Sequence, residues 1–144
     1  MKKALFSRLF VALAIVGGIN LWLGISNELN VQAESLDQPT PLNQVFPDEA
    51  LAEVVKASLN KSDMTDSVTQ AELNTVKFID GQEKSIASIE GLQYLSNLET
   101  LRMKDNKISD ISLLSHLSNL RVINLSNNQI TDITSLAHLK KYLV

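Results

Sequence analysis

The chain has 144 residues, enough for one domain, with 44% hydrophobic residues, no cysteine and a formal net charge of −3. Without cysteine, a disulfide framework, thiol chemistry and thiolate metal sites are excluded, so the fold must depend on packing. A mildly acidic chain with no basic cluster is a poor partner for nucleic acid or for anionic membranes.

The first 33 residues have the pattern of a signal peptide. Three basic residues within the first eight positions precede an apolar run over residues 9–25. Val31 and Ala33 then suit the positions that a signal peptidase recognises, which predicts cleavage between Ala33 and Glu34 and a secreted or cell-surface protein. An uncleaved anchor is the alternative, because an apolar run of about 17–25 residues can just span a bilayer.

Residues 34–75 are predicted to form a helical segment before the rest of the chain. Two prolines, Pro39 and Pro41, keep the first eight residues extended. Pro47 and the acidic residues after it mark a helix start, and apolar residues at helical spacing then predict a helix from Asp48 to Leu59. Phe46 is expected to pack on the first turn of that helix.

A second, short helix is predicted at residue 69, where Thr69 and Glu72 form a capping box. The oxygen-rich residues 63–67 lie between the two helices. A calcium-binding loop that began at Asp63 would need glycine at its sixth position and glutamate at its twelfth, where this chain has Val68 and Asn74. We therefore expect a plain helical turn there.

Apolar residues recur every 22 residues through the second half of the chain. Residues 97–118 and 119–140 align without gaps, residues 76–96 form a degenerate first copy, and residues 141–144 open a further one. The aligned core positions of the three copies are Val76, Ile79, Gly81, Ile86, Ile89, Leu92 and Leu95; Leu98, Leu101, Met103, Ile108, Ile111, Leu114 and Leu117; and Leu120, Ile123, Leu125, Ile130, Ile133, Leu136 and Leu139.

This period is typical of leucine-rich repeats. Leu101 and Met103 alternate as in a short strand, and Asn106 falls where the chain must turn and satisfy buried backbone groups. The spacing of three from Ile108 onward suits a 3₁₀ return. One repeat cannot bury its apolar edge alone, so the copies must stack. The predicted fold class is α/β, a leucine-rich-repeat solenoid with parallel strands on its concave face and an α-helical amino-terminal cap.

Two polar ladders invite an enzymatic interpretation. His116 and His138 are 22 residues apart, as are Asp110 and Asp132. No nucleophile, base and orienting group converge around them, so a metal-dependent hydrolase is the least favoured alternative. We interpret the aspartates as residues that cap or hydrogen-bond the return turn, and we predict no catalytic residues, no metal and no cofactor.

Four parts of the sequence, within residues 34–140, are distinctive together: residues 40–48, 68–73 and 86–95, and the Asn-x-Ile-[Ser/Thr]-Asp-Ile core of both full repeats. In these segments the chain resembles the internalins, leucine-rich surface and secreted proteins of invasive Gram-positive bacteria. The resemblance implies an α-helical cap fused to a parallel-stranded solenoid whose concave face binds a host protein in adhesion or virulence.

The chain departs from this family in its length. Family members usually carry more repeats and then an immunoglobulin-like region, whereas here residues 141–144 open a repeat and stop. We therefore expect a truncated member, most like a short secreted internalin. The alternative to a host-protein-binding module is a non-functional remnant of a longer internalin.

The predicted binding residues lie between the core positions of the strands. Protein hot spots favour aromatic residues and arginine, so Phe78 and Arg102 are the strongest candidates. Three coils offer a few hundred Å², below the roughly 800 Å² per partner of a standard interface. The nine predicted residues are Phe78, Asp80, Gln82, Thr100, Arg102, Lys104, Val122, Asn124 and Ser126.

Overall fold

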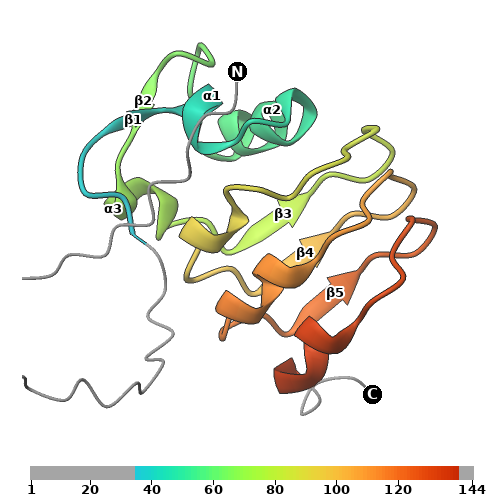
Figure 1. Cartoon of the computed structure of the whole chain (residues 1–144). Coiled ribbons are helices and arrows are strands. Elements are labelled where there is room, and N and C mark those ends of the chain that lie inside the picture. The colour runs from blue at the N-terminus through green and yellow to red at the C-terminus, as the bar shows by residue number, and fades with distance from the viewer. Residues whose placement is uncertain (1–34, 140–144) are drawn as a thin grey trace, which may run out of the picture. The chain divides into compact units, whose positions relative to one another are not determined.

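A helical cap and a stack of three coils make up the computed structural model, which describes residues 35–139 (Figure 1). These residues belong to one compact unit. The predicted signal segment and residues 141–144 lie outside the described residues. Within residues 35–139, no helix is both long enough and apolar enough to cross a membrane.

The cap begins with two structures that the sequence did not predict. Strand β1 (Thr40–Pro41) pairs antiparallel with β2 (Ser67–Val68), and the four-residue helix α1 (Leu42–Val45) follows β1 directly. Proline is compatible with a helix start because the first N–H groups of a helix have no partner inside it. The N–H of Leu42 instead donates to the carbonyl of Asp66 at 3.0 Å.

Residues 63–66 form a tight turn, and residue 67 begins a strand. The plain helical turn predicted for residues 63–67 therefore does not extend over all five residues. The Asp66 N–H donates to the Asp63 carbonyl at 3.2 Å, and Ser67 already belongs to strand β2. The Asp63 carboxylate accepts from the N–H and the hydroxyl of Thr65, and these two bonds lower its pKa. The predicted helical turn was wrong at Ser67, because a strand of two residues is too short to show a periodic sequence pattern.

Both predicted cap helices are confirmed. Helix α2 (Glu49–Ser58) is capped by Asp48, whose Oδ1 accepts from the Leu51 N–H at 3.1 Å. Helix α3 (Gln70–Leu73) carries the predicted capping box with Thr69 and Glu72. Leu51, Ala52 and Val55 of α2 are fully buried and Val54 is partly buried, so this apolar side of the helix packs against the core.

Each coil of the stack runs from a three-residue strand to a 3₁₀ return. Strands β3 (Phe78–Asp80), β4 (Thr100–Arg102) and β5 (Val122–Asn124) are parallel, and each residue pairs with the residue 22 positions further on. The returns are η1 (Leu92–Tyr94), η2 (Ser112–His116) and η3 (Thr134–Leu139). The predicted strand register and 3₁₀ returns are confirmed. We call these units coil 1, coil 2 and coil 3.

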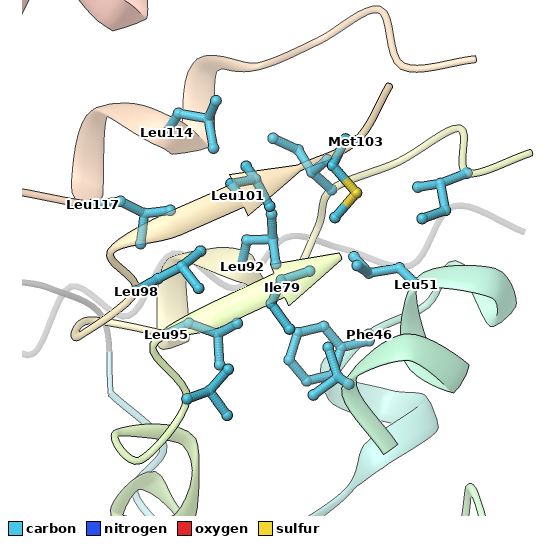
Figure 2. Packing of buried hydrophobic residues seen from close by; sticks show 14 of the residues in the cluster. Phe46, Leu51, Ile79, Leu92, Leu95, Leu98, Leu101, Met103, Leu114 and Leu117 are labelled. Carbon is cyan, nitrogen blue, oxygen red and sulfur yellow. The ribbon is translucent and has the colours of Figure 1, made fainter. Parts of the chain in front are cut away.

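A single hydrophobic core runs from the cap into the coils. Phe46 and Leu51 of the cap lie in the same cluster as Ile79, Leu92 and Leu101 of the first two coils (Figure 2). All five side chains are almost completely buried. Burying a side chain of this size contributes about 1.5–3 kcal/mol, so the cap and coil 1 stabilise each other.

Two asparagine ladders hold the coils together at opposite ends of the strands. Asn106 accepts from the Ile86 N–H at 2.9 Å and donates to the Gly81 carbonyl at 2.8 Å, which confirms the predicted role of this residue. The second ladder was not predicted. The Asn97 amide donates to the Asn74 carbonyl at 3.0 Å, and the Asn119 amide donates one coil later to Ser96.

Candidate binding face

The nine predicted binding residues lie on the open face of the parallel sheet, which we call the strand face. Strand pairing sets Phe78, Thr100 and Val122 side by side in one row, and Asp80, Arg102 and Asn124 in the next. None of the nine is buried. The third row, one residue beyond the core position that follows each strand, is Gln82, Lys104 and Ser126.

Phe78 and Arg102 contact each other across neighbouring strands. The Arg102 guanidinium carbon lies 5.5 Å from the centre of the Phe78 ring, within the range of a cation–π interaction. An Arg102 nitrogen also lies 3.9 Å from a carboxylate oxygen of Asp80. Phe78 nevertheless remains 49% exposed. The two predicted hot-spot residues therefore form one cluster, with the ring held at the surface.

The other polar members of the strand face are engaged locally. The Gln82 amide donates to the Asp80 carboxylate at 3.0 Å, and the Ser126 hydroxyl donates to the Asn124 side-chain carbonyl at 2.8 Å. The Lys104 ammonium lies 3.2 Å from a carboxylate oxygen of Asp105. The apolar surface of the face is thus limited to Phe78 and to Val122, which is 50% exposed.

An ion pair between Lys77 and Glu99 lies beside the strand face, and the sequence analysis did not predict it. The Lys77 ammonium lies 3.1 Å from a carboxylate oxygen of Glu99, and both side chains are well exposed. Such surface pairs contribute little to stability, about 0–1 kcal/mol. Their 22-residue spacing was the signal that could have placed them beside the Phe78 row.

The exit of each strand uses a left-handed backbone. Glu83, Asp105 and Asn127 occupy the same position in the three coils, with φ angles of 56°, 57° and 57°. Aspartate and asparagine tolerate this region better than other non-glycine residues, so the coil 1 turn, with glutamate, departs from the pattern of the other two. The Asn127 amide also donates to the Asp105 carboxylate, which lowers the pKa of Asp105.

The aspartate ladder hydrogen-bonds the backbone of the return turns, as predicted. Asp110 accepts from the Ser112 N–H at 2.8 Å, and Asp132 accepts from the Thr134 N–H at 2.8 Å. These backbone hydrogen bonds lower the pKa of both carboxyl groups. Both aspartates therefore already have a structural role, as acceptors in the turns that begin η2 and η3.

Of the two histidines spaced 22 residues apart, the structure describes the side chain of His116 only. Nδ1 of His116 lies 3.2 Å from the Leu113 carbonyl of its own return, and the side chain of His138 lies outside the described part of the chain. Among residues 35–139, no three His, Cys, Asp or Glu residues are grouped so that they could hold a metal ion.

Asp48 joins the cap to the coils at one edge of the sheet. One carboxylate oxygen caps α2, and the other accepts from the N–H groups of Ala87 and Ser88 at 2.8 and 3.0 Å. Burial acts to raise the pKa of Asp48, but the backbone hydrogen bonds outweigh it and hold that pKa below its ordinary value. Asp48 therefore stabilises the position of the strands relative to the cap as a carboxylate.

Comparison with known proteins identifies both parts of this architecture. A family model described as the N-terminal region of a bacterial adhesion/invasion protein matches residues 31–74, and a model of two leucine-rich repeats matches residues 96–138. The crystal structure of internalin C2 from Listeria monocytogenes is similar with a TM-score of 0.73 and 42% identity, covering 75% of this chain and 48% of that one. The predicted fold class is thus confirmed.

Two curated proteins of Listeria monocytogenes are also similar. Internalin H is 41% identical over 110 residues, which is 74% of this chain and 20% of internalin H. Internalin C is 42% identical over 85 residues, which is 59% of this chain and 29% of internalin C. The chain therefore spans between a fifth and a third of the length of these two relatives.

Proposed function

We propose that this chain, which belongs to the internalin family, binds a host protein through its strand face. The observation that carries the proposal is the Phe78–Arg102 cluster. An aromatic ring at the surface of a sheet, held beneath a guanidinium, has the composition of a protein-binding hot spot. The family model described as a bacterial adhesion/invasion protein supports the same conclusion.

The geometry of the cluster favours recognition of a protein. Phe78 keeps half of its surface open while Arg102 restricts the ring, so little side-chain entropy is lost on binding. Thr100 and Val122 extend the Phe78 row over the next two strands. A partner that presents an apolar side chain to this row and a hydrogen-bond acceptor to Arg102 would contact all three coils.

The remaining parts of the proposal concern organisation and export. We assign residues 1–33 to a signal peptide cleaved between Ala33 and Glu34, residues 34–75 to the cap, and residues 76–96, 97–118 and 119–140 to successive repeats. The mature chain is then secreted or held at the cell surface. It acts by binding rather than by catalysis, and it needs no metal or cofactor.

The test is capture of host proteins by immobilised residues 34–144. We expect Phe78→Ala and Arg102→Ala each to reduce capture by about tenfold or more, as for hot-spot residues whose loss costs at least 1.4 kcal/mol. Glu90→Ala is the control, because Glu90 is exposed and lies shortly before the return η1, outside the strand face. Equal capture by the wild type and all three variants would refute binding by the strand face.

A further inference from the structure

Charge is divided unequally between two halves of each coil. We call the strand and the turn after it the strand half (residues 77–87, 99–109 and 121–131) and the remainder of each coil the return half. Within residues 76–139, every lysine and arginine lies in the strand half. They are Lys77, Lys84, Arg102, Lys104, Lys107 and Arg121. With histidine counted as neutral, the charged residues of the return half in this range are all acidic, namely Glu90, Asp110 and Asp132.

The cap adds to this asymmetry. Residues 35–75 contain seven acidic residues against two basic ones, Lys56 and Lys61. Hydrogen bonds lower the pKa of Asp48, Asp63 and Glu72, so these groups are carboxylates at neutral pH. Separated charges of this kind orient a charged partner before contact. The cap and the return half repel an acidic partner, whereas the strand half attracts it.

The acidic residues of the strand half are largely engaged within it. Three of the four are held by a neighbouring side chain: Asp80 by Gln82, Glu99 by Lys77 and Asp105 by Lys104. Lys84 and Lys107 are exposed, and among residues 35–139 neither forms an ion pair. The charge that the strand half presents to a partner is therefore positive.

Arg102 is the cation of this half that lies at the centre of the strand face. Its side chain is 50% exposed, and its guanidinium carbon lies 5.5 Å from the centre of the Phe78 ring. The 3.9 Å between Arg102 and the Asp80 carboxylate is too long for a hydrogen bond. A guanidinium carries five N–H donors in a planar fork that matches the two oxygens of a carboxylate. Arg102 can therefore bind a carboxylate from a partner without first breaking a hydrogen bond to Asp80.

We propose that the partner of the strand face is an acidic protein segment, which places a carboxylate on Arg102 and a neighbouring apolar side chain on Phe78. The inference rests on the proposed function and specifies the chemistry of the partner. Acidic and basic residues are interspersed in the strand half, which disfavours a uniform polyanion such as nucleic acid. A protein segment combines the carboxylate and the apolar group that the Phe78–Arg102 cluster can bind.

Selection of phage-displayed random dodecapeptides on the immobilised full chain tests this chemistry. We expect peptides with net negative charge and an apolar residue beside an aspartate or glutamate to be enriched about tenfold or more. Arg102→Gln should lower their recovery about tenfold or more, because a carboxylate loses a charged hydrogen-bond partner. Arg102→Lys should fall between these, because lysine keeps the charge but lacks the fork.

Lys56→Gln is the matched control for Arg102→Gln. It removes the same charge from helix α2, outside the strand half, and should leave recovery unchanged. Salt provides a second readout, because a rise from about 0.1 M to about 1 M NaCl shortens the Debye length from about 10 Å to about 3 Å. The recovery of acidic peptides on the wild type should then fall severalfold.

The outcomes separate this inference from the proposed function. Neutral peptides that need Phe78 but are recovered equally with Arg102→Gln would overturn the acidic partner and leave the strand face as a binding site. Acidic peptides recovered equally by the wild type and Arg102→Gln would bind elsewhere and would also overturn it. So would the recovery of no peptide above background, in which case capture of host proteins still decides the proposed function.

Discussion

The two ends of the coil stack are built differently. At the β3 end, the cap buries Phe46 and Leu51 in the common core, and Asp48 binds coil 1 through two backbone N–H groups. At the β5 end, Ile133 is exposed, four other core positions of coil 3 are only partly buried, and the N–H groups of Leu125 and Asn127 have no backbone acceptor within the described residues. Equivalent positions of the repeat, such as Ile111 and Ile133, are therefore buried in one coil and exposed in another, depending on whether a neighbouring coil covers them.

The largest difference in stability between substitutions at equivalent positions is expected for Ile111 and Ile133. Ile111→Ala should destabilise the protein by about 3 kcal/mol because it leaves a cavity, whereas Ile133→Ala should change stability by less than about 0.5 kcal/mol. Urea unfolding of both variants checks this. Equal losses would mean that the two ends of the stack are equally covered.

The asparagine ladder gives a smaller difference. Asn106→Ala should cost about 2 kcal/mol or more, because it leaves the carbonyl of Gly81 and the N–H of Ile86 buried without partners. Asn128→Ala should cost about 1 kcal/mol, because Asn128 is only partly buried. Chemical unfolding midpoints measure both losses. A greater loss for Asn128→Ala would contradict the proposed difference between the ends.

The smallest effect is expected at Asp48 and depends on pH. The pKa of Asp48 is lowered in the folded state, so the carboxylate stabilises the fold above its ordinary pKa of about 3.9 and that contribution is lost as the pH falls through the lower folded value. Asp48→Asn should therefore destabilise the protein by about 1 kcal/mol at pH 7 and progressively less below pH 4. Thermal unfolding across this pH range tests it. A loss that is the same at pH 3 and pH 7 would show that the charge is not involved.

Most of the fold was predictable because the repeat fixes it. The 22-residue period places each core side chain, and pairing at that interval then sets the strand register. Strands β1 and β2 were missed because two residues carry no periodic signal. Helix α1 was missed because Pro41 suggested extended chain, although a proline is tolerated where a helix begins.

The sequence predicted which residues lie on the strand face, but it did not predict the contact between Phe78 and Arg102. Alignment of the repeats places Phe78 opposite Thr100, and the structure confirms that pairing. The contact between Phe78 and Arg102 runs diagonally between strands and depends on side-chain rotamers, which a repeat alignment does not contain. For the same reason the engagement of Lys104 by Asp105 was not foreseen.

Hydroxyl-radical footprinting tests the central claim about the strand face most directly. Oxidation of Phe78 is measured in the free chain and in the complex with a captured host protein, with the buried Phe46 as an internal reference. The account predicts strong protection of Phe78 on binding and low oxidation of Phe46 in both states. Oxidation of Phe78 at the same rate in the free chain and in the complex would show that the partner binds elsewhere.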